Sequence, residues 1–144
     1  MKFEDDKPVV GCGSDMLGVR IDCDDPDITP DGEQMVHRCG DGLSVYSCLC
    51  TIPPSRVPKS LKGIVIGARG SLNRHIWRFG NGLFTEGQLC EGLSLKPDEP
   101  INKPQHGVVQ PDRAMHIDAF QQYLADTQND WIVDEVLNEA CLHD

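Results

Sequence analysis

Residues 107–131, GVVQPDRAMHIDAFQQYLADTQNDW, decide the fold class, because they place an apolar run directly before an amphipathic one. Gly107–Gln110 has the length and composition of a short strand, and Pro111 ends it. Four apolar side chains and one threonine then recur at intervals of three and four residues: Ile117, Phe120, Leu124, Thr127 and Trp131. This is the period of an α-helix, so we expect a helix over Ile117–Trp131, with His116 at its cap position.

Upstream of this stretch the sequence predicts short strands separated by turns. They cover Val9–Val10, Leu17–Ile21, Leu43–Leu49, Gly63–Gly67, Arg74–Phe79 and Leu93–Leu95. Asp41-Gly42 is a hairpin signal, and the continuous apolar run Gly63–Gly67 is typical of a buried central strand. A second helical stretch is expected near Val133–Cys141.

Strands first and a helix last predict an α+β domain. We expect a mostly antiparallel sheet of short strands, with one amphipathic C-terminal helix packed on it. The prediction is a single domain over residues 9–144, preceded by a frayed N-terminus at residues 1–8.

Charge is distributed in three blocks. The net charge of −10 divides into −7 over residues 1–35, +4 over 36–113 and −7 over 114–144. No acid lies between Asp41 and Glu86. The overall acidity argues against nucleic acid as a partner. The basic middle has two interpretations: it packs against the acidic C-terminal helix, or it forms an anion-binding patch.

Two further features bear on the compartment. No apolar run approaches the ~20 residues that span a bilayer, and no export signal is visible, so we expect a cytoplasmic protein without membrane contact. The cysteines are seven, an odd number, which predicts reduced thiols rather than a disulfide framework.

One group of soft ligands requires a test against metal binding: His37, Cys39, Cys48 and Cys50. A tight turn at Gly40–Gly42 would set Cys39 opposite Leu43 and leave the later pair out of reach. We therefore expect no metal, and buried thiols that behave as small hydrophobes.

The segment from Arg69 to Phe79 is the best candidate for chemistry, because arginine presents a planar fork that matches phosphate or carboxylate. Candidate anion- or nucleotide-binding residues are Arg69, Arg74, His75, Arg78 and His106. Trp77 and Phe79 could offer a stacking face. No phosphate-binding glycine motif is present, so such binding would rest on side chains. The alternative is a basic hairpin tip with Trp77 in the core.

Several short motifs in the C-terminal part carry a resemblance. They are Gly82-Leu83-Phe84, Gly92-Leu93-Ser94-Leu95, His106-Gly107-Val108-Val109-Gln110-Pro111 with Met115, and the helix up to Trp131. Over about a third of the chain they resemble the C-terminal half of toxin domains related to the ADP-ribosyltransferase fold of type VI secretion effectors. The resemblance implies a mixed sheet, nicotinamide dinucleotide binding and toxicity in the cytosol. The chain has no Glu-x-Glu, so no catalytic residue is carried over.

Two functions follow as expectations. The first is a small cytosolic interaction or accessory domain, which binds a protein partner or a second copy through the Ile117–Trp131 helix and needs no cofactor. The second is a nucleotide-binding enzyme, an ADP-ribosyltransferase-like toxin that uses NAD. Arg74 and Arg78 separate them, because the first function expects ion pairs with Asp126, Asp130 or Asp134, and the second expects both to line a concave pocket.

Overall fold

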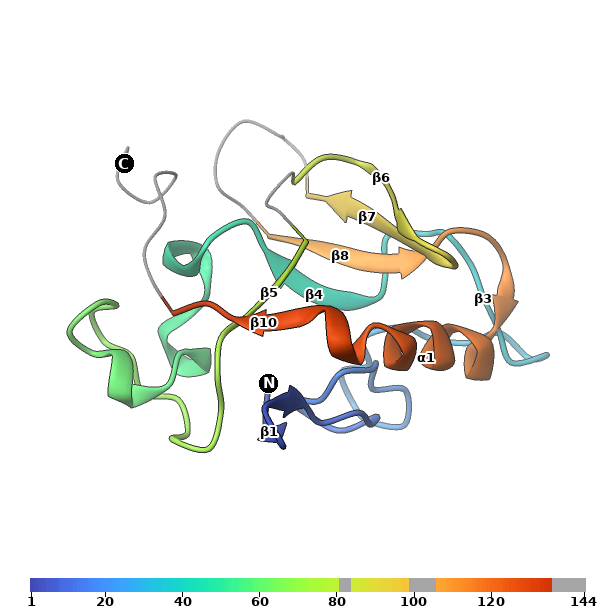
Figure 1. Ribbon diagram of the computed structural model, residues 1–144. Coiled ribbons are helices and arrows are strands. Elements are labelled where there is room, and N and C mark those ends of the chain that lie inside the picture. Colours follow the sequence, from blue (N-terminus) through green and yellow to red (C-terminus); the bar gives the residue numbers. More distant parts are fainter. Residues whose placement is uncertain (81–83, 99–105, 136–144) are drawn as a thin grey trace.

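The computed structural model describes residues 1–80, 84–98 and 106–135, and its main sheet has four antiparallel strands (Figure 1). The order across the sheet is β4-β8-β7-β6, with bounds Leu43–Tyr46, His106–Pro111, Leu93–Pro97 and Gly87–Cys90. Strand β8 is central: Val109 pairs with Leu43 of β4 on one side and with Leu95 of β7 on the other. Its central position explains its continuous apolar run.

Helix α1 (Ile117–Asp126) packs on this sheet. Phe120 and Leu124 share a buried cluster with Leu93 of β7 and Val109 of β8. The His116 ring caps the helix as expected, since its Nδ1 accepts a hydrogen bond from the Asp118 amide at 3.0 Å. The α+β fold class, mostly antiparallel with an amphipathic helix on the sheet, is thus confirmed. No helix in the described part of the chain is long and apolar enough to cross a bilayer.

The helix ends at Asp126, so the prediction of a helix up to Trp131 is wrong. The Thr127 hydroxyl donates to the Leu124 carbonyl at 2.6 Å, and a 3₁₀ turn, η4 (Gln128–Asp130), follows. Acidic side chains at Asp126 and Asp130 oppose the negative end of the helix dipole, which disfavours a longer helix.

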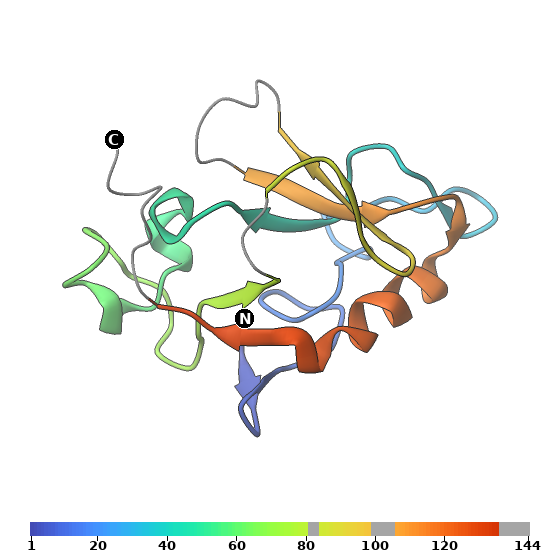
Figure 2. The same cartoon turned by 45° about the horizontal axis from the view of Figure 1, so that its top comes forward.

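After this turn the chain becomes β10 (Trp131–Val133), which pairs antiparallel with β5 (Trp77–Phe79) in a two-stranded ribbon (Figure 2). The Trp131 ring packs on that of Phe79, with centroids 5.1 Å apart, and this contact stabilises the strand. Val133 therefore begins no second helix, and residues 136–141 of that expected stretch lie outside the described residues.

The hairpin expected at Asp41-Gly42 is also wrong. Strand β3 (Met35–Val36) pairs with β9 (Met115–His116), whereas β4 pairs with β8. The Gly40 amide donates to the Gln110 side chain at 2.9 Å, and a Cβ on Gly42 would lie 2.0 Å from the Val109 carbonyl oxygen. This close backbone contact leads the chain into the main sheet instead of turning it back on itself.

The first eight residues are anchored, in contrast to the expectation of a frayed end. Strands β1 (Phe3–Glu4) and β2 (Lys7–Pro8) form a hairpin whose turn residues Asp5 and Asp6 have φ of 52° and 61°. The backbone of Met1 accepts a hydrogen bond from the His75 amide at 3.0 Å. This partner is distant in the chain, so no local pattern indicates it.

The strands expected at Val9–Val10 and Leu17–Ile21 reduce to a single bridge between Val10 and Leu17. Beyond it, the backbone of Val19 is bound by a side chain: Gln121 of α1 donates to its carbonyl at 2.7 Å and accepts from its amide at 3.0 Å. A glutamine therefore takes the place of a strand partner.

The run Gly63–Gly67 is not the buried central strand that the sequence predicts. It belongs to a lobe built from three 3₁₀ turns, η1 (Leu49–Thr51), η2 (Pro54–Arg56) and η3 (Lys59–Leu61), and from the loops up to β5 (Figure 1). The amides of Ile64 and Val65 both donate to the Leu61 carbonyl at 2.9 Å, which closes a turn. Apolar composition alone does not distinguish a buried strand from such a turn.

Candidate ligand-binding cavity

A cavity of about 410 Å³ lies between the main sheet and the β5–β10 ribbon. All residues of β4 and of β5 contribute to its wall, together with Trp131 of β10. Figure 2 shows β5 running between β4 and β10. The cavity therefore depends on three strands that are far apart in the sequence.

Aromatic side chains supply much of the wall: Tyr46, Trp77, Phe79, Phe84 and Trp131. Hydrogen bonds orient the two indoles, since Trp77 Nε1 donates to the Met1 carbonyl at 3.0 Å and Trp131 Nε1 donates to Thr127 Oγ1 at 2.9 Å. Planar, apolar surfaces with fixed orientation suit a planar, apolar ligand.

The charged groups of the wall are nearly all paired. Arg20 donates to both carboxylate oxygens of Asp27, at 3.3 Å from Nε and 3.0 Å from Nη2, and this bonding raises the pKa of the Arg20 guanidinium. Arg78 Nε donates to Asp134 at 3.0 Å, and Asp15 accepts from Arg74 at 2.8 Å. The acids of the wall are therefore neutralised within the protein.

Arg56 is different, because its guanidinium has no ion pair or side-chain hydrogen bond in the part of the chain that the structure describes. It is exposed, and it lines the cavity from η2. A guanidinium without an internal partner beside an aromatic wall is a ready anchor for an anionic group.

A second, polar cavity of about 300 Å³ adjoins the first, and Arg20, Asp27, Ser44 and Arg56 line both. His106 belongs to this second cavity, where its Nδ1 lies 2.8 Å from Asp98 Oδ2. Arg56 therefore stands where an apolar space meets a polar one.

The structure separates the five residues that the sequence singles out. His75 and Arg78 line the aromatic cavity, and His106 lines the polar one. Arg69 is exposed, and neither Arg69 nor Arg74 lines either cavity. The three arginines among the candidate anion-binding residues, Arg69, Arg74 and Arg78, are therefore not gathered at one cavity.

Arg74 and Arg78, which separate the two expected functions, have different surroundings. Arg78 both pairs with Asp134, as the interaction function expects, and lines the cavity, as the ligand-binding function expects. Arg74 instead pairs with Asp15, which belongs to the acidic N-terminal block of residues 1–35 and not to the C-terminal acids that the interaction function names.

Two further titratable groups line the aromatic cavity, the His75 imidazole and the Met1 amine. His75 Nδ1 lies 3.0 Å from Glu135 Oε1, and its ring packs 4.3 Å from that of Phe3. Burial is the largest effect on the Met1 amino group and lowers its pKa to about 6. This amine, which also lines the cavity, therefore adds little positive charge near neutral pH.

Sequence reasoning missed Arg56, Tyr46, Phe84 and Trp131 as site residues. Arg56 carries no local signal, since it lies in a proline-rich segment expected to be loop and no sequence pattern distinguishes it from the basic residues that follow. Trp131 was assigned to the helix. Only the pairing of β5 with β10 brings it to the cavity.

His37 has an acidic partner, and the cysteines differ in exposure and in bonding. His37 Nε2 lies 3.0 Å from Asp31 Oδ2, and no group of three or more His, Cys, Asp or Glu side chains among the described residues is placed to hold a metal. Five of the described cysteines form no disulfide, whereas Cys50 is disulfide-bonded; the five are Cys12, Cys23, Cys39, Cys48 and Cys90. Cys12, Cys23 and Cys39 are exposed, so the expectation of buried thiols is wrong for them.

Comparison with protein families, with curated proteins and with solved structures finds no match to this chain. The resemblance to ADP-ribosyltransferase-related toxin domains therefore stays a prediction.

Proposed function

We propose that the protein binds a small aromatic or heterocyclic organic anion in the cavity between β4 and the β5–β10 ribbon. The observation that carries the proposal is that one cavity is lined both by aromatic side chains and by Arg56, whose guanidinium has no ion pair among the described residues. The volume of about 410 Å³ falls in the range of small-molecule sites, which is roughly 300–1,000 Å³.

The arrangement divides the ligand into two parts. Its planar body would lie against Trp77, Phe79 and Trp131, while its anionic group would lie at Arg56, where the cavity opens to the polar one. A nucleotide has this composition, with a base as the planar body and a phosphate as the anion. The nucleotide-using enzyme, with NAD as its cofactor, is thus a more specific form of the proposal, in which Arg56 replaces Arg69 and Arg74 as the anion-binding group.

Intrinsic fluorescence tests the proposal directly, because both tryptophans of the chain line the cavity. The chain is titrated with adenosine monophosphate, with NAD and with benzoate, and each anion is compared with an uncharged analogue. We expect saturable quenching by at least one anion. Charge-assisted hydrogen bonds contribute about 1.5–3 kcal/mol, so Arg56→Gln weakens that anion roughly tenfold or more and leaves the uncharged analogue unchanged.

Arg69→Gln is the matched control. Arg69 is an exposed arginine of the same lobe that lines neither cavity, so its removal changes the net charge equally and leaves the affinity as it is. Absence of any spectral change at millimolar concentration of every anion, or equal losses in both variants, contradicts the proposal.

The interaction function is a second proposal, which the outer face of α1 supports. Asp118, Gln122 and Asp126 are exposed there, and no Lys or Arg lies on the helix, whereas Phe120 and Leu124 are buried in the core. A partner, or a second copy, would therefore meet a polar, acidic surface. Light scattering at low salt tests self-association, and a pull-down with basic proteins tests a partner. A monomer that captures none of these proteins contradicts this proposal. We place the protein in the cytoplasm because five of its described cysteines form no disulfide; Cys50, which is disulfide-bonded, is the exception.

A further inference from the structure

The lobe between β4 and β5 has its own small core. Leu49, Val57 and Ala68 are buried there, and Leu61, Val65 and other partly buried side chains pack against them. Backbone hydrogen bonds tie its loops together, because the Arg69 amide donates to the Pro54 carbonyl at 3.0 Å and the Gly70 amide donates to the Val57 carbonyl at 2.7 Å. The lobe is therefore a built unit whose outward side chains have defined positions.

Large aliphatic side chains point outward from this unit. Ile66 is 93% exposed, Leu72 is 61% exposed and Ile64 is 39% exposed, although the intervening Val65 turns into the lobe. The Lys59 amide donates to the Gly70 carbonyl at 3.0 Å, which ties the start of η3 to the loop that leads to Leu72. Ile64 and Ile66 stand two residues apart on one exposed turn, and exposed aliphatic side chains gathered in this way mark an interaction surface.

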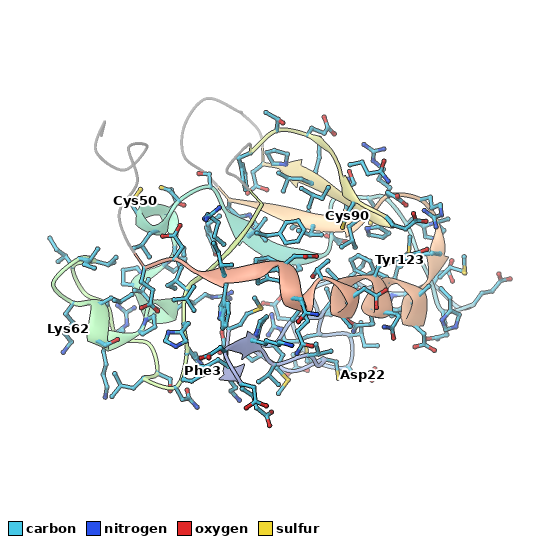
Figure 3. All side chains as sticks on the ribbon, in the orientation of Figure 1. Phe3, Asp22, Cys50, Lys62, Cys90 and Tyr123 are labelled. Carbon is cyan, nitrogen blue, oxygen red and sulfur yellow. The ribbon has the colours of Figure 1, made fainter. Side chains whose placement is uncertain are left out.

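The same lobe carries exposed cations. Lys59, Lys62 and Arg69 are exposed, and none of them has an ion pair in the described ranges. Lys62 extends from the outer end of the lobe (Figure 3). Since no acid occurs between Asp41 and Glu86, the lobe is a basic, apolar-tipped end on an otherwise acidic chain.

We propose that this apolar-tipped lobe docks on the anionic surface of a lipid bilayer. The aliphatic groups stand on a protruding turn, so they suit insertion into a deformable interface, while the surrounding ammonium and guanidinium groups lie at the level of the lipid phosphates. A basic residue near an anionic leaflet strengthens binding about fivefold, and the effect falls off within roughly 8 Å at physiological salt. Such docking departs from the expectation of no membrane contact, but it needs no membrane-spanning segment, and no helix among the described residues could supply one.

The test is co-sedimentation of the full chain with vesicles of phosphatidylcholine alone and of a phosphatidylserine-rich mixture. We expect binding to the anionic vesicles that weakens as salt is raised, and little binding to the neutral ones. Ile66→Ser removes the tip without touching the lobe core, and Lys62→Gln removes one charge; we expect each to weaken binding about fivefold or more.

Ile132→Ser is the matched control, because Ile132 is a 50% exposed isoleucine on β10, away from the lobe. It should bind vesicles as the unaltered chain does. Failure to bind phosphatidylserine-rich vesicles, or equal effects of Ile66→Ser and Ile132→Ser, overturns the proposal. Self-association without lipid that Ile66→Ser abolishes also overturns it, in favour of a second copy as the occupant. None of these measurements depends on a ligand in the aromatic cavity.

Discussion

Replacement of Gln121 by alanine tests whether one side chain holds the N-terminal segment onto α1. Its amide group bonds both backbone polar groups of Val19, at 2.7 Å to the carbonyl and 3.0 Å to the amide. Val19 is 0% exposed, so water does not readily replace these partners. The variant leaves one donor and one acceptor unpaired in the interior.

The expected loss follows from those two groups. An unsatisfied buried polar group costs about 1–3 kcal/mol, and partial relaxation reduces the sum of two, so we expect the free energy of unfolding to fall by roughly 2–4 kcal/mol. Such a loss is a large fraction of the ~5–15 kcal/mol by which a domain is stable. Helix propensity changes by a few tenths of a kcal/mol at most, because glutamine and alanine are both good helix formers.

The assay is urea unfolding followed by circular dichroism, with Gln122→Ala as the control. Gln122 is the next residue of the same helix and is exposed, and within the described ranges its side chain bonds only that of Asp126, at 2.8 Å. Its replacement should change stability by less than about 0.5 kcal/mol. If the two variants lose the same stability, the bridge between α1 and Val19 contributes nothing and the reasoning fails.

Three further outcomes are expected. Phe120→Ala should lower the free energy of unfolding by about 3–5 kcal/mol in the same assay, because the ring is 0% exposed in the main core; a loss below ~1 kcal/mol would contradict this packing. Burial, then nearby carboxylates, raises the pKa of the Cys90 thiol, so iodoacetamide should modify it more slowly than exposed Cys39 in mass-mapped kinetics. The hydrogen bond from His37 is the largest cause that lowers the pKa of Asp31 from about 3.8. An NMR titration should show this pKa rise in His37→Ala, and the stabilisation from the pair is present above pH ~4 and lost as pH falls through the lowered value; an unchanged pKa rejects the contact.

Local patterns predicted those parts of the fold whose signal is local. Strand β4, strand β7, strand β8 and the start of α1 were all indicated, because alternation, a β-branched run and a helical period each depend on neighbours in the chain. The end of α1 was not indicated, because the strand that follows it is stabilised by the contact of Trp131 with Phe79, a residue distant in the sequence.

The candidate site was predicted only in part for the same reason. The basic and aromatic composition of residues 69–79 predicted two residues that line the cavity, His75 and Arg78. Composition could not show that Arg74 pairs with Asp15, that Arg69 lines neither cavity, or that Arg56 lines both without an ion pair among the described residues.

The sequence by itself determined the α+β class, the acidic termini around a basic middle, and the apolar faces of the strands and of α1. These properties are sums over residues or short-range periodicities, so they need no knowledge of contacts. The tertiary structure alone decided which strands pair, where the cavity lies, and that Ile64 and Ile66 of the apolar run Gly63–Gly67 are exposed on a basic lobe. Pairing and burial are relations between distant segments, and the free energy that selects them resides in packing that no single stretch contains.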